Sequence, residues 1–379
     1  MIRIGIEAQR IFRPDKHGMD YVILEVLYRL QQQNDDHEYF VFVAPGEDRC
    51  LKDTKRMHII ELHCPTYPLW EQFALPRAVK RAKVDLLHCT SNTAPLYCPV
   101  PLVITLHDII FLDMTKSKGM SRYQQMGWYY RRWNIPLIVN RCQHLITVSK
   151  TEYFNILTHF PQIENKLSVV HNGYSECYHP LPNEELHHVT HCYLPDEKYL
   201  FFLGNTDPRK NTIGVLHAYH AYLSRSKHPL KLIITGLKKE DVEKWLKEAG
   251  MEICIPQIIY TGYVPGKDLP ALYGGAFAFL YPSLKEGFGI PVLESMACGT
   301  PVITSNCSSL PEVAGNGGIL VNPSNPTEIT EALLRLETDP VFYQEQCTYG
   351  LERVKQFSWQ QTVDGYTKIY KQILNLSEL

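Results

Sequence analysis

Residues 276–294 read Ala-Phe-Ala-Phe-Leu-Tyr-Pro-Ser-Leu-Lys-Glu-Gly-Phe-Gly-Ile-Pro-Val-Leu-Glu. The first six residues are apolar and rich in aromatics, which predicts a buried strand from Ala276 to Tyr281. Two glycines then indicate a loop, and Pro291 lies near the first position of a helix that ends near Gly299. A buried strand, a glycine loop and a helix form the repeating unit of a parallel α/β sheet.

The same alternation of short apolar runs and longer helical patterns extends in both directions along the chain. One helix is expected over Tyr21 to Gln33, and one series of strands precedes Asn172-Gly173 while a second follows it. The first series covers Ile2 to Ile6, Tyr39 to Val43, Met57 to Leu62, Leu86 to His88, Leu102 to Leu106 and His144 to Val148. The second covers Tyr199 to Leu203, Leu230 to Thr235, Ile258 to Thr261, Phe277 to Tyr281, Val302 to Thr304 and Gly318 to Val321.

Two such series predict two doubly wound, Rossmann-like parallel sheets in tandem, facing across a cleft. A length of 379 residues also favours two domains. Tyr178 to Pro182 is a proline-containing hinge candidate, so we expect domains over residues 1–178 and 179–356. A helical pattern from Phe357 to Leu376 is left over, and we expect the segment 357–379 to cross back to the first domain.

Composition excludes several classes of protein. The net charge of −2 gives no general attraction to nucleic acid or to anionic lipid. Eleven cysteines without a C-x-x-C spacing favour a reducing cytoplasm over a disulfide scaffold. No apolar run has the roughly 18–20 residues that a membrane-spanning helix needs. A helix over Met120 to Trp133, with Arg122, Arg131 and Arg132, is typical of an ordinary amphipathic helix, although the same mixture suits peripheral membrane contact.

Metal and nicotinamide chemistry are not favoured by the motifs. No Asp-x-Asp is present, and no G-x-G-x-x-G follows the first strand. His187, His188, His191 and Cys192 could share one helical face as metal ligands, but a helix end near the hinge explains them as well. We therefore expect no bound metal and no resident cofactor.

The glycine loop predicts an anion site, because backbone N–H groups and a helix N-terminus can approach a ligand there. Glu286 lies on this loop and Glu294 in the first helical turns, where the two carboxylates could bind hydroxyl groups of two sugars. The alternative is a packing loop, in which Glu294 complements the helix dipole and Glu286 is solvated.

A second candidate segment, Gly204 to Asn211, follows another predicted strand and contains Arg209 and Lys210. A helix N-terminus stabilises an anion by only about 0.3–2 kcal/mol, so these cations would supply the remaining stabilisation of a diphosphate. The alternative is a solvated basic turn. His107, at the end of a strand in the first half, is either a ligand-facing histidine or a hydrogen-bonded structural one.

At this point the residues resemble glycosyltransferase family 4, the retaining group with the GT-B fold, over almost the whole chain. Glu286 to Glu294 matches its Glu-x7-Glu signature, and the Gly204 to Asn211 segment is similar to its phosphate loop. Further similar segments occur in the family's order: Val148-Ser149-Lys150, His171-Asn172-Gly173, Gly262-Tyr263-Val264, Asp268-Leu269 to Tyr273, Pro311-Glu312-Val313 and Phe357-Ser358-Trp359.

The resemblance implies roles for named residues. Glu286 would contact the donor sugar, Glu294 the ribose, Arg209 with Lys210 the diphosphate, and His107 the transferred sugar. The rest of the implied donor site comprises Gly204, Asn205, Tyr263, Val264, Gly287, Phe288, Gly289, Ile290 and Leu293. One departure is Asp20, which stands before Tyr21 where many members of the family have Arg.

The resemblance further implies metal-independent transfer of a hexose, with retention of configuration, from a GDP- or UDP-sugar. A saccharide or lipid-linked acceptor in the biosynthesis of cell-surface polysaccharide is expected. The leaving diphosphate would help to remove the acceptor proton. The alternatives are an epimerase or phosphorylase of the same architecture, or a non-catalytic protein that binds nucleotide sugars.

Overall fold

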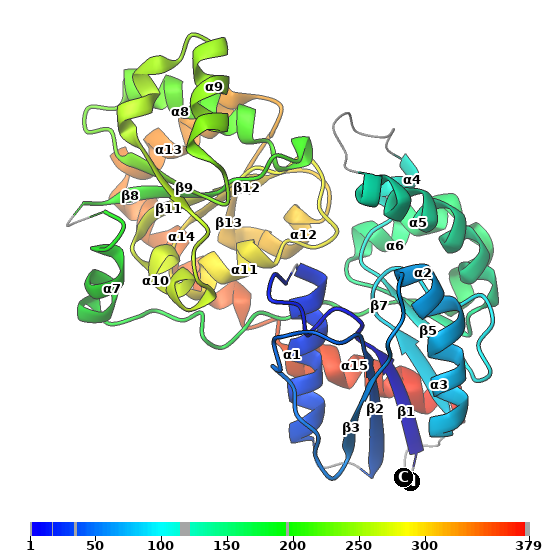
Figure 1. Ribbon diagram of the computed structural model, residues 1–379. Coiled ribbons are helices and arrows are strands. Elements are labelled where there is room, and N and C mark those ends of the chain that lie inside the picture. Colours follow the sequence, from blue (N-terminus) through cyan, green and yellow to red (C-terminus); the bar gives the residue numbers. More distant parts are fainter. Residues whose placement is uncertain (1, 17, 34–35, 114–121, 195–196, 376–379) are drawn as a thin grey trace. The chain divides into compact units, whose positions relative to one another are not determined.

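The computed structural model describes residues 2–16, 18–33, 36–113, 122–194 and 197–375 (Figure 1). The chain forms two compact units, and each has its own sheet. Unit 1 comprises Met1–Gly173 with Trp359–Leu379, and unit 2 comprises Tyr174–Ser358. The chain therefore passes between the units at Gly173 and again at Ser358, whereas residue 178 and residue 356 were the expected boundaries.

Unit 1 contains a seven-stranded parallel sheet in the order β3-β2-β1-β4-β5-β6-β7. The six predicted strands are confirmed, with ends that differ by at most two residues. The seventh, β7, was not predicted. The strands are β1 (Ile2–Glu7), β2 (His37–Val43), β3 (Met57–Glu61), β4 (Leu86–Cys89), β5 (Leu102–Leu106), β6 (His144–Thr147) and β7 (Leu167–Val169).

The helices of unit 1 cover its sheet, whose central strands are buried. Their bounds are α1 (Gly18–Gln32), α2 (Tyr67–Leu69), the π-helix η1 (Trp70–Ala74), α3 (Leu75–Ala82), α4 (Ile110–Asp113), α5 (Arg122–Arg141), α6 (Lys150–His159), the 3-10 helix η2 (Pro161–Lys166) and α15 (Trp359–Ile373). The predicted helix at Tyr21 is α1. Of the predicted helix from Met120, the structure has α5 from Arg122 onward, and Met120 lies outside the described residues.

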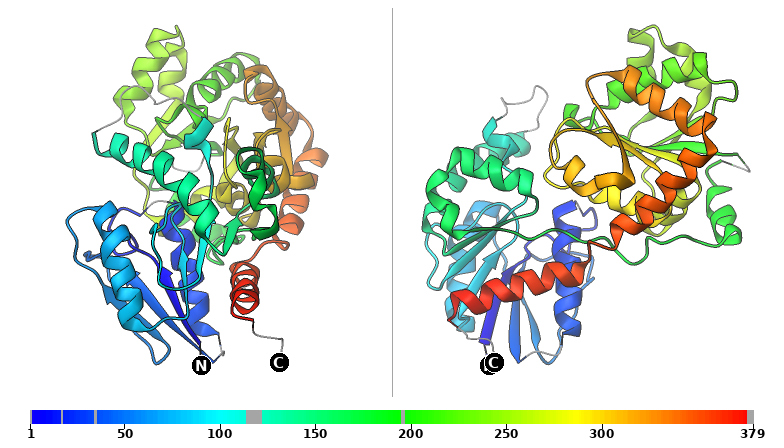
Figure 2. Two further views of the ribbon diagram at one scale, coloured as in Figure 1. Left: turned by 90° about the vertical axis from the view of Figure 1, so that its right-hand side faces the viewer. Right: turned by 180° about the vertical axis from the view of Figure 1, so that it is seen from behind.

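The C-terminal helix α15 belongs to unit 1, where it packs against α1 (Figure 2). The Tyr370 hydroxyl lies 2.6 Å from His88 Nδ1, and the Tyr366 ring meets the imidazole edge-on at 4.9 Å. The Thr362 hydroxyl donates to the carbonyl of His171 at 2.7 Å. Burial lowers the pKa of His88 to about 3, so the imidazole is neutral and joins α15 to β4 by packing and hydrogen bonding.

The packing of η1 against α5 surrounds a buried acid, Glu71. Its side chain accepts hydrogen bonds from Tyr67 and Thr93, both at 2.6 Å, and from Tyr130 at 2.5 Å. All three donors are neutral hydroxyls, and Glu71 itself is fully buried. Burial raises the pKa of Glu71 to about 7, although these hydrogen bonds oppose the shift.

Unit 2 contains a six-stranded parallel sheet in the order β10-β9-β8-β11-β12-β13. All six predicted strands are confirmed. They are β8 (Tyr199–Leu203), β9 (Lys231–Thr235), β10 (Ile258–Gly262), β11 (Ala276–Tyr281), β12 (Val302–Ser305) and β13 (Gly318–Val321). The inner strands β8, β9, β11 and β12 are largely buried because helices cover the sheet, which explains their continuous apolar runs.

The helical segments of unit 2 alternate with its strands, and several are single turns. They are α7 (Asn183–Thr190), η3 (Pro208–Lys210), α8 (Thr212–Arg225), α9 (Lys239–Glu248), η4 (Glu252–Gln257), η5 (Gly266–Asp268), α10 (Leu269–Gly274), α11 (Ile290–Ala297), α12 (Leu310–Ala314), η6 (Gly315–Gly317), α13 (Pro326–Thr338) and α14 (Pro340–Val354).

Each sheet has a point at which the strand order reverses. In unit 1 this point lies between β1 and β4, and in unit 2 it lies between β8 and β11. Ligands of open parallel sheets bind outside the carboxyl ends of the strands at such a point. The predicted doubly wound α/β architecture is therefore confirmed, and the loops after β8 and β11 meet at one edge of the unit 2 sheet.

Candidate functional site

The loop after β8 is shaped by its own polar side chains. Asn205 Oδ1 accepts from the Asp207 amide at 2.8 Å, and Asp207 caps η3 by accepting from the Arg209 amide at 3.0 Å. Asn211 ends η3 with a left-handed φ of 58°, and its Nδ2 donates to the carbonyls of Pro282 and Pro323 at 3.0 and 2.7 Å. The loop after β8 is thereby fixed to the loop after β11.

Two glycines of the predicted site lie where a larger residue would crowd neighbouring side chains. A Cβ on Gly204 would lie 2.5 Å from Leu237 Cδ1, so the loop leaves β8 in close contact with that side chain. Gly289 precedes α11 with a φ of 114°, and a Cβ there would lie 2.7 Å from Leu310 Cδ2. Both positions let the loop backbone run against its neighbours.

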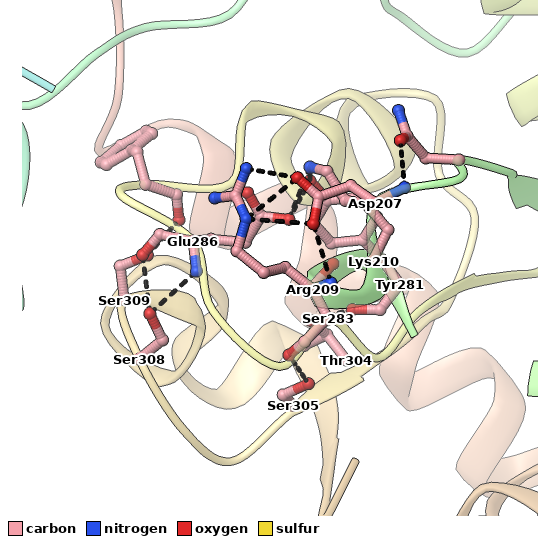
Figure 3. A network of polar contacts seen from close by, with 12 residues as sticks. Asp207, Arg209, Lys210, Tyr281, Ser283, Glu286, Thr304, Ser305, Ser308 and Ser309 are labelled. Carbon is pink, nitrogen blue, oxygen red and sulfur yellow. Dashed lines mark hydrogen bonds and ion pairs between the residues drawn. The ribbon is translucent and has the colours of Figure 1, made fainter. Parts of the chain in front are cut away.

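Lys210 and Glu286 form the centre of the site, together with Tyr281 (Figure 3). Lys210 Nζ lies 2.6 Å from Glu286 Oε1 and 3.0 Å from the Tyr281 hydroxyl, which itself donates to Glu286 Oε1 at 2.8 Å. Burial lowers the pKa of Lys210, but Tyr281 and Glu286 outweigh burial and raise it above the usual range. The lysine is therefore a fixed cation at the carboxyl ends of β8 and β11.

Arg209 has a different partner from Lys210 in this structure. Its guanidinium contacts the Asp207 carboxylate through Nε at 3.0 Å and Nη2 at 2.6 Å. About 28% of the Arg209 side chain and 34% of the Asp207 side chain remain exposed, so solvent screens this pair. Arg209 and Lys210, although adjacent in sequence, thus form ion pairs with two different carboxylates.

Ser308 and Ser309, which the sequence did not single out, hold the Glu286 loop. The Glu286 amide donates to Ser308 Oγ at 3.0 Å, and Ser308 Oγ donates back to the Glu286 carbonyl at 2.6 Å. Ser309 Oγ lies 2.9 Å from the carbonyl of Glu286 and 2.8 Å from that of Phe288. Their place just after β12, the strand beside β11, was the signal that could have identified them.

Glu294 lies in α11, one helical turn beyond Ile290, and takes part in a second cluster. It accepts a hydrogen bond from the Tyr273 hydroxyl at 3.0 Å and another from Tyr178. Burial raises the pKa of Glu294 to about 7, while the hydrogen bonds from the two tyrosines oppose the shift. Its protonation can therefore change near neutral pH.

An aromatic row connects the two glutamate clusters. Phe279 and Tyr281 stack along β11 with ring centroids 5.7 Å apart, and Tyr273 packs edge-on against Phe279 at 4.9 Å. The hydroxyls at the two ends of this row, on Tyr281 and Tyr273, donate to Glu286 and Glu294 respectively. The row therefore belongs to both clusters.

The remaining predicted donor-site residues differ in exposure. Tyr263 follows β10 and is 79% exposed, whereas Val264 is buried. Leu293 is fully buried in α11, and Phe288 is buried against Phe357, with ring centroids 5.9 Å apart. Gly287 and Ile290, on either side of Phe288 and Gly289, are partly exposed, so they supply the accessible backbone at the start of α11.

His107 lies at the end of β5 in unit 1. Its amide donates to Asn92 Oδ1 at 2.6 Å, and Nε2 lies 2.9 Å from the Thr90 carbonyl. Because a carbonyl only accepts, Nε2 carries the proton and Nδ1 is an acceptor. Burial lowers the pKa of His107, although the Thr90 carbonyl opposes the shift, which favours a neutral ring at pH 7.

Asp20, the departure from the family pattern, is buried in α1. Arg10 Nε lies 3.3 Å from Asp20 Oδ1, so the acid is matched by a cation from the segment after β1. Glu7, at the end of β1, is fully buried and accepts from the amides of Gln9 and Thr90 at 2.9 and 3.2 Å. Burial raises the pKa of Glu7, while the Gln9 amide and the charge of Arg10 oppose the shift.

The structure offers no support for the metal alternative in the part of the chain that it describes. No group of three His, Cys, Asp or Glu side chains there could hold a metal ion, including the histidines of α7. Within the same residues, no helix combines the length and the apolar character that crossing a bilayer requires.

Comparison with known proteins agrees with the fold and with the sequence motifs. The model of the family "Glycosyltransferase Family 4" matches residues 17–176, and that of "Glycosyl transferases group 1" matches residues 192–353. The O-antigen chain mannosyltransferase B of Escherichia coli is 32% identical over 271 residues, which cover 70% of this chain and 69% of that protein. The O-antigen chain mannosyltransferase RfbU of Salmonella typhimurium is 28% identical over 80% of this chain and 78% of its own.

Among solved structures, a glycosyltransferase from Rickettsia africae has a TM-score of 0.74 at 17% identity and covers 99% of both chains. This likeness shows the fold, and the likeness to the Escherichia coli enzyme shows the family. The chain belongs to glycosyltransferase family 4 and is a glycosyltransferase with the two Rossmann-like sheets of the GT-B fold.

Proposed function

We propose that this protein transfers a hexose, most simply mannose, from a nucleotide diphosphate sugar to a saccharide or lipid-linked acceptor, with retention of configuration. The observation that carries the proposal is the Lys210–Glu286–Tyr281 cluster, which places a cation and a carboxylate beside the N-terminus of α11. The names of the two curated relatives support mannose and an acceptor that is a cell-surface polysaccharide.

The site can stabilise a departing diphosphate. When the bond between the anomeric carbon and the phosphate oxygen breaks, negative charge develops on the leaving oxygen. Lys210 can donate to that oxygen, and the backbone N–H groups before α11 add a partial positive charge. In a same-face displacement, the acceptor oxygen bonds to the anomeric carbon while its proton passes to the leaving phosphate oxygen.

The carboxylates account for the sugars on either side of the diphosphate. Glu286 is held through its backbone by Ser308 and Ser309, and its carboxylate can accept hydrogen bonds from hexose hydroxyls. Glu294 can accept from the ribose hydroxyls. In unit 1, a neutral His107 with Nδ1 as an acceptor can bind a sugar hydroxyl.

The nucleotide base is the least constrained part of the proposal. Tyr263 is exposed beside buried Val264, directly after β10, and its ring offers a face on which a base could stack. Mannose is carried as GDP-mannose, so we expect a guanine nucleotide to bind more tightly than a uracil nucleotide.

A screen of donors tests the proposal. Thermal shifts of the purified protein would be measured with GDP-mannose, UDP-glucose and UDP-galactose, because a ligand at 100 times its Kd stabilises the folded state by about 2.7 kcal/mol. Transfer from the stabilising donor would then be followed by NMR, with a chelator present. We expect a product with the donor's anomeric configuration, and an inverted product would contradict the proposal.

A variant and two control reactions complete the test. Glu286→Ala should reduce turnover by orders of magnitude while the circular dichroism spectrum is unchanged. Conversion of the donor sugar without an acceptor would indicate an epimerase, and dependence on inorganic phosphate would indicate a phosphorylase. Binding of the nucleotide sugar without transfer or hydrolysis would indicate a binding protein.

A further inference from the structure

Helix α5 of unit 1 exposes a row of large apolar and aromatic side chains. Met126, Tyr129, Trp133 and Leu137 are 64%, 56%, 53% and 37% exposed. They recur at steps of three and four residues, so they lie on one face of the helix. An exposed apolar face of this kind marks an interaction surface.

Side chains from the neighbouring segment α2–η1 extend this row. Leu69 is 44% exposed and Phe73 is 53% exposed. Gln72 Nε2 donates to the Tyr130 hydroxyl at 2.6 Å, which joins η1 to α5, and the Tyr130 and Trp133 rings are 6.1 Å apart. The two sets of apolar side chains are therefore borne by segments that lie side by side, as Figure 1 shows for α2 and α5.

The same elements are strongly basic, although the whole chain has a net charge of −2. Within residues 67–83 and 125–141 the only acid is Glu71, and it is fully buried. The cations in these two segments are Arg77, Lys80, Arg81, Lys83, Arg131, Arg132 and Arg141. All of them except Arg131, which is partly buried, are exposed, and Arg77 lies over the Phe73 ring at 5.7 Å.

We propose that this face, formed by the exposed residues of α2, η1, α3 and α5, docks the protein on an anionic lipid bilayer. Tyrosine and tryptophan prefer the level of the lipid headgroups, and the apolar side chains can enter the acyl boundary. The arginines and lysines are then attracted to anionic headgroups. Aliphatic side chains such as Met126 and Leu137 give nucleic acid nothing to bind, which favours lipid over an oligonucleotide.

Docking goes beyond the proposed transfer chemistry and does not depend on it. The face lies on α2, η1, α3 and α5, whereas Lys210, Glu286 and Glu294 belong to unit 2. A lipid-linked acceptor would be met at the bilayer surface, so docking would raise its local concentration.

Vesicle flotation with the 379-residue chain tests the proposal. Vesicles of phosphatidylcholine with one quarter phosphatidylglycerol would be compared with pure phosphatidylcholine, at low and high salt. We expect at least tenfold stronger partition onto the anionic vesicles, weakened by salt. The double variants Tyr129→Ser/Trp133→Ser and Lys80→Glu/Arg81→Glu should each lose at least tenfold in partition.

Matched controls come from unit 2. Ile253→Ser/Tyr349→Ser removes side chains that are 66% and 47% exposed, and Lys244→Glu/Lys247→Glu makes the same charge change on α9. These variants should partition like the wild type, and all variants should keep the wild-type melting temperature. Donor hydrolysis, measured separately in the absence of lipid, distinguishes a failure of docking from a failure of the proposed chemistry.

Four results would overturn the proposal. One is absence of wild-type partition onto anionic vesicles, and another is equal partition of the face variants and the wild type. The third is a wild-type dimer that Tyr129→Ser/Trp133→Ser converts to a monomer in light scattering. The fourth is an oligonucleotide that competes the protein off the vesicles. Those outcomes would assign the face to a second copy of the chain or to nucleic acid.

Discussion

Glu286 in unit 2 and Glu71 in unit 1 are both buried and both accept a hydrogen bond from a tyrosine, but only Glu286 has a cation. Lys210 lies 2.6 Å from Glu286, whereas the three hydroxyl donors of Glu71 are neutral. Burial raises the pKa of Glu71 to about 7. A neighbouring cation compensates a buried charge in a way that neutral hydroxyls do not.

The surroundings of the two glutamates also differ in whether a ligand could reach them. The Glu286 cluster lies at the carboxyl ends of two strands, where a ligand can replace one partner with another. The Glu71 cluster joins η1 to α5 and has every carboxylate oxygen occupied. We therefore expect changes around Glu286 to affect catalysis, and changes at Glu71 to affect stability.

The largest effect is expected from Lys210→Met, which makes Glu286 resemble Glu71 by removing its cation. Loss of one preorganised donor to developing negative charge lowers kcat by about 10²–10³-fold. Initial rates of hexose transfer would be compared with those of Lys244→Met, an exposed lysine on α9. A kcat within threefold of the wild type would show that Lys210 does not stabilise the leaving group.

A smaller effect is expected from Glu294→Gln, because this buried carboxyl has tyrosine donors and no cation, like Glu71. Loss of its charge should raise the KM for the donor about tenfold and change kcat little. Burial sets the pKa of Glu294 at about 7, and the charged form is the better acceptor for ribose hydroxyls. The wild-type KM should therefore fall as the pH rises from 6 to 8, and this fall should be absent in the variant. A KM that is independent of pH in both proteins would separate Glu294 from the donor.

Arg209→Ala should have a still smaller effect, a few-fold in kcat/KM, because Asp207 already neutralises the guanidinium in this structure. Asp207→Asn provides the complementary variant, because it removes the carboxylate charge but keeps an acceptor for the Arg209 amide, and it should not reduce turnover. If Arg209→Ala were as damaging as Lys210→Met, Arg209 would have to leave Asp207 when the donor binds.

Glu71→Gln should leave turnover within twofold of the wild type and change only the dependence of stability on pH. The pKa of Glu71 is raised from 4.5 to about 7, so the folded protein binds the additional proton. The stabilisation is present below pH 4.5 and is lost as the pH rises to 7, and its size is on the order of 3 kcal/mol. Melting temperatures from pH 4.5 to 7.5 should fall more steeply for the wild type than for the variant. Parallel curves would indicate that Glu71 is ionised throughout.

The fold followed from the sequence because buried parallel strands have a distinctive composition. All strands except β7 were predicted, and β7 is a three-residue strand with Ser168 at its centre, too short to show a pattern. The single-turn helices and the π-helix η1 could not be predicted, since they depend on packing and have no period of their own. The predicted helix from Phe357 begins only at Trp359, and Phe357 instead packs against Phe288 in unit 2.

The site was only partly accessible to the same reasoning. Lys210 and Glu286 each follow a predicted strand of the second sheet, which favoured a common site. The structure brings the two side chains together because β8 and β11 are neighbouring strands. The hydrogen bond from Tyr281 to Glu286 was not predicted, because a tyrosine at the end of an apolar strand is first interpreted as a core residue. Arg209 and Lys210 are adjacent in sequence but have different partners. Arg209 contacts Asp207, two residues earlier, and the sequence pattern of this loop did not predict that contact.

The return of α15 to unit 1 has a consequence for how the protein is made. Residues 1–173 are synthesised before unit 2, but His88 can meet the Tyr370 hydroxyl only after unit 2 and α15 have been synthesised. Unit 2 is continuous in sequence and can complete its core earlier, as domains that emerge whole do. Unit 1 is therefore begun before unit 2 and completed after it.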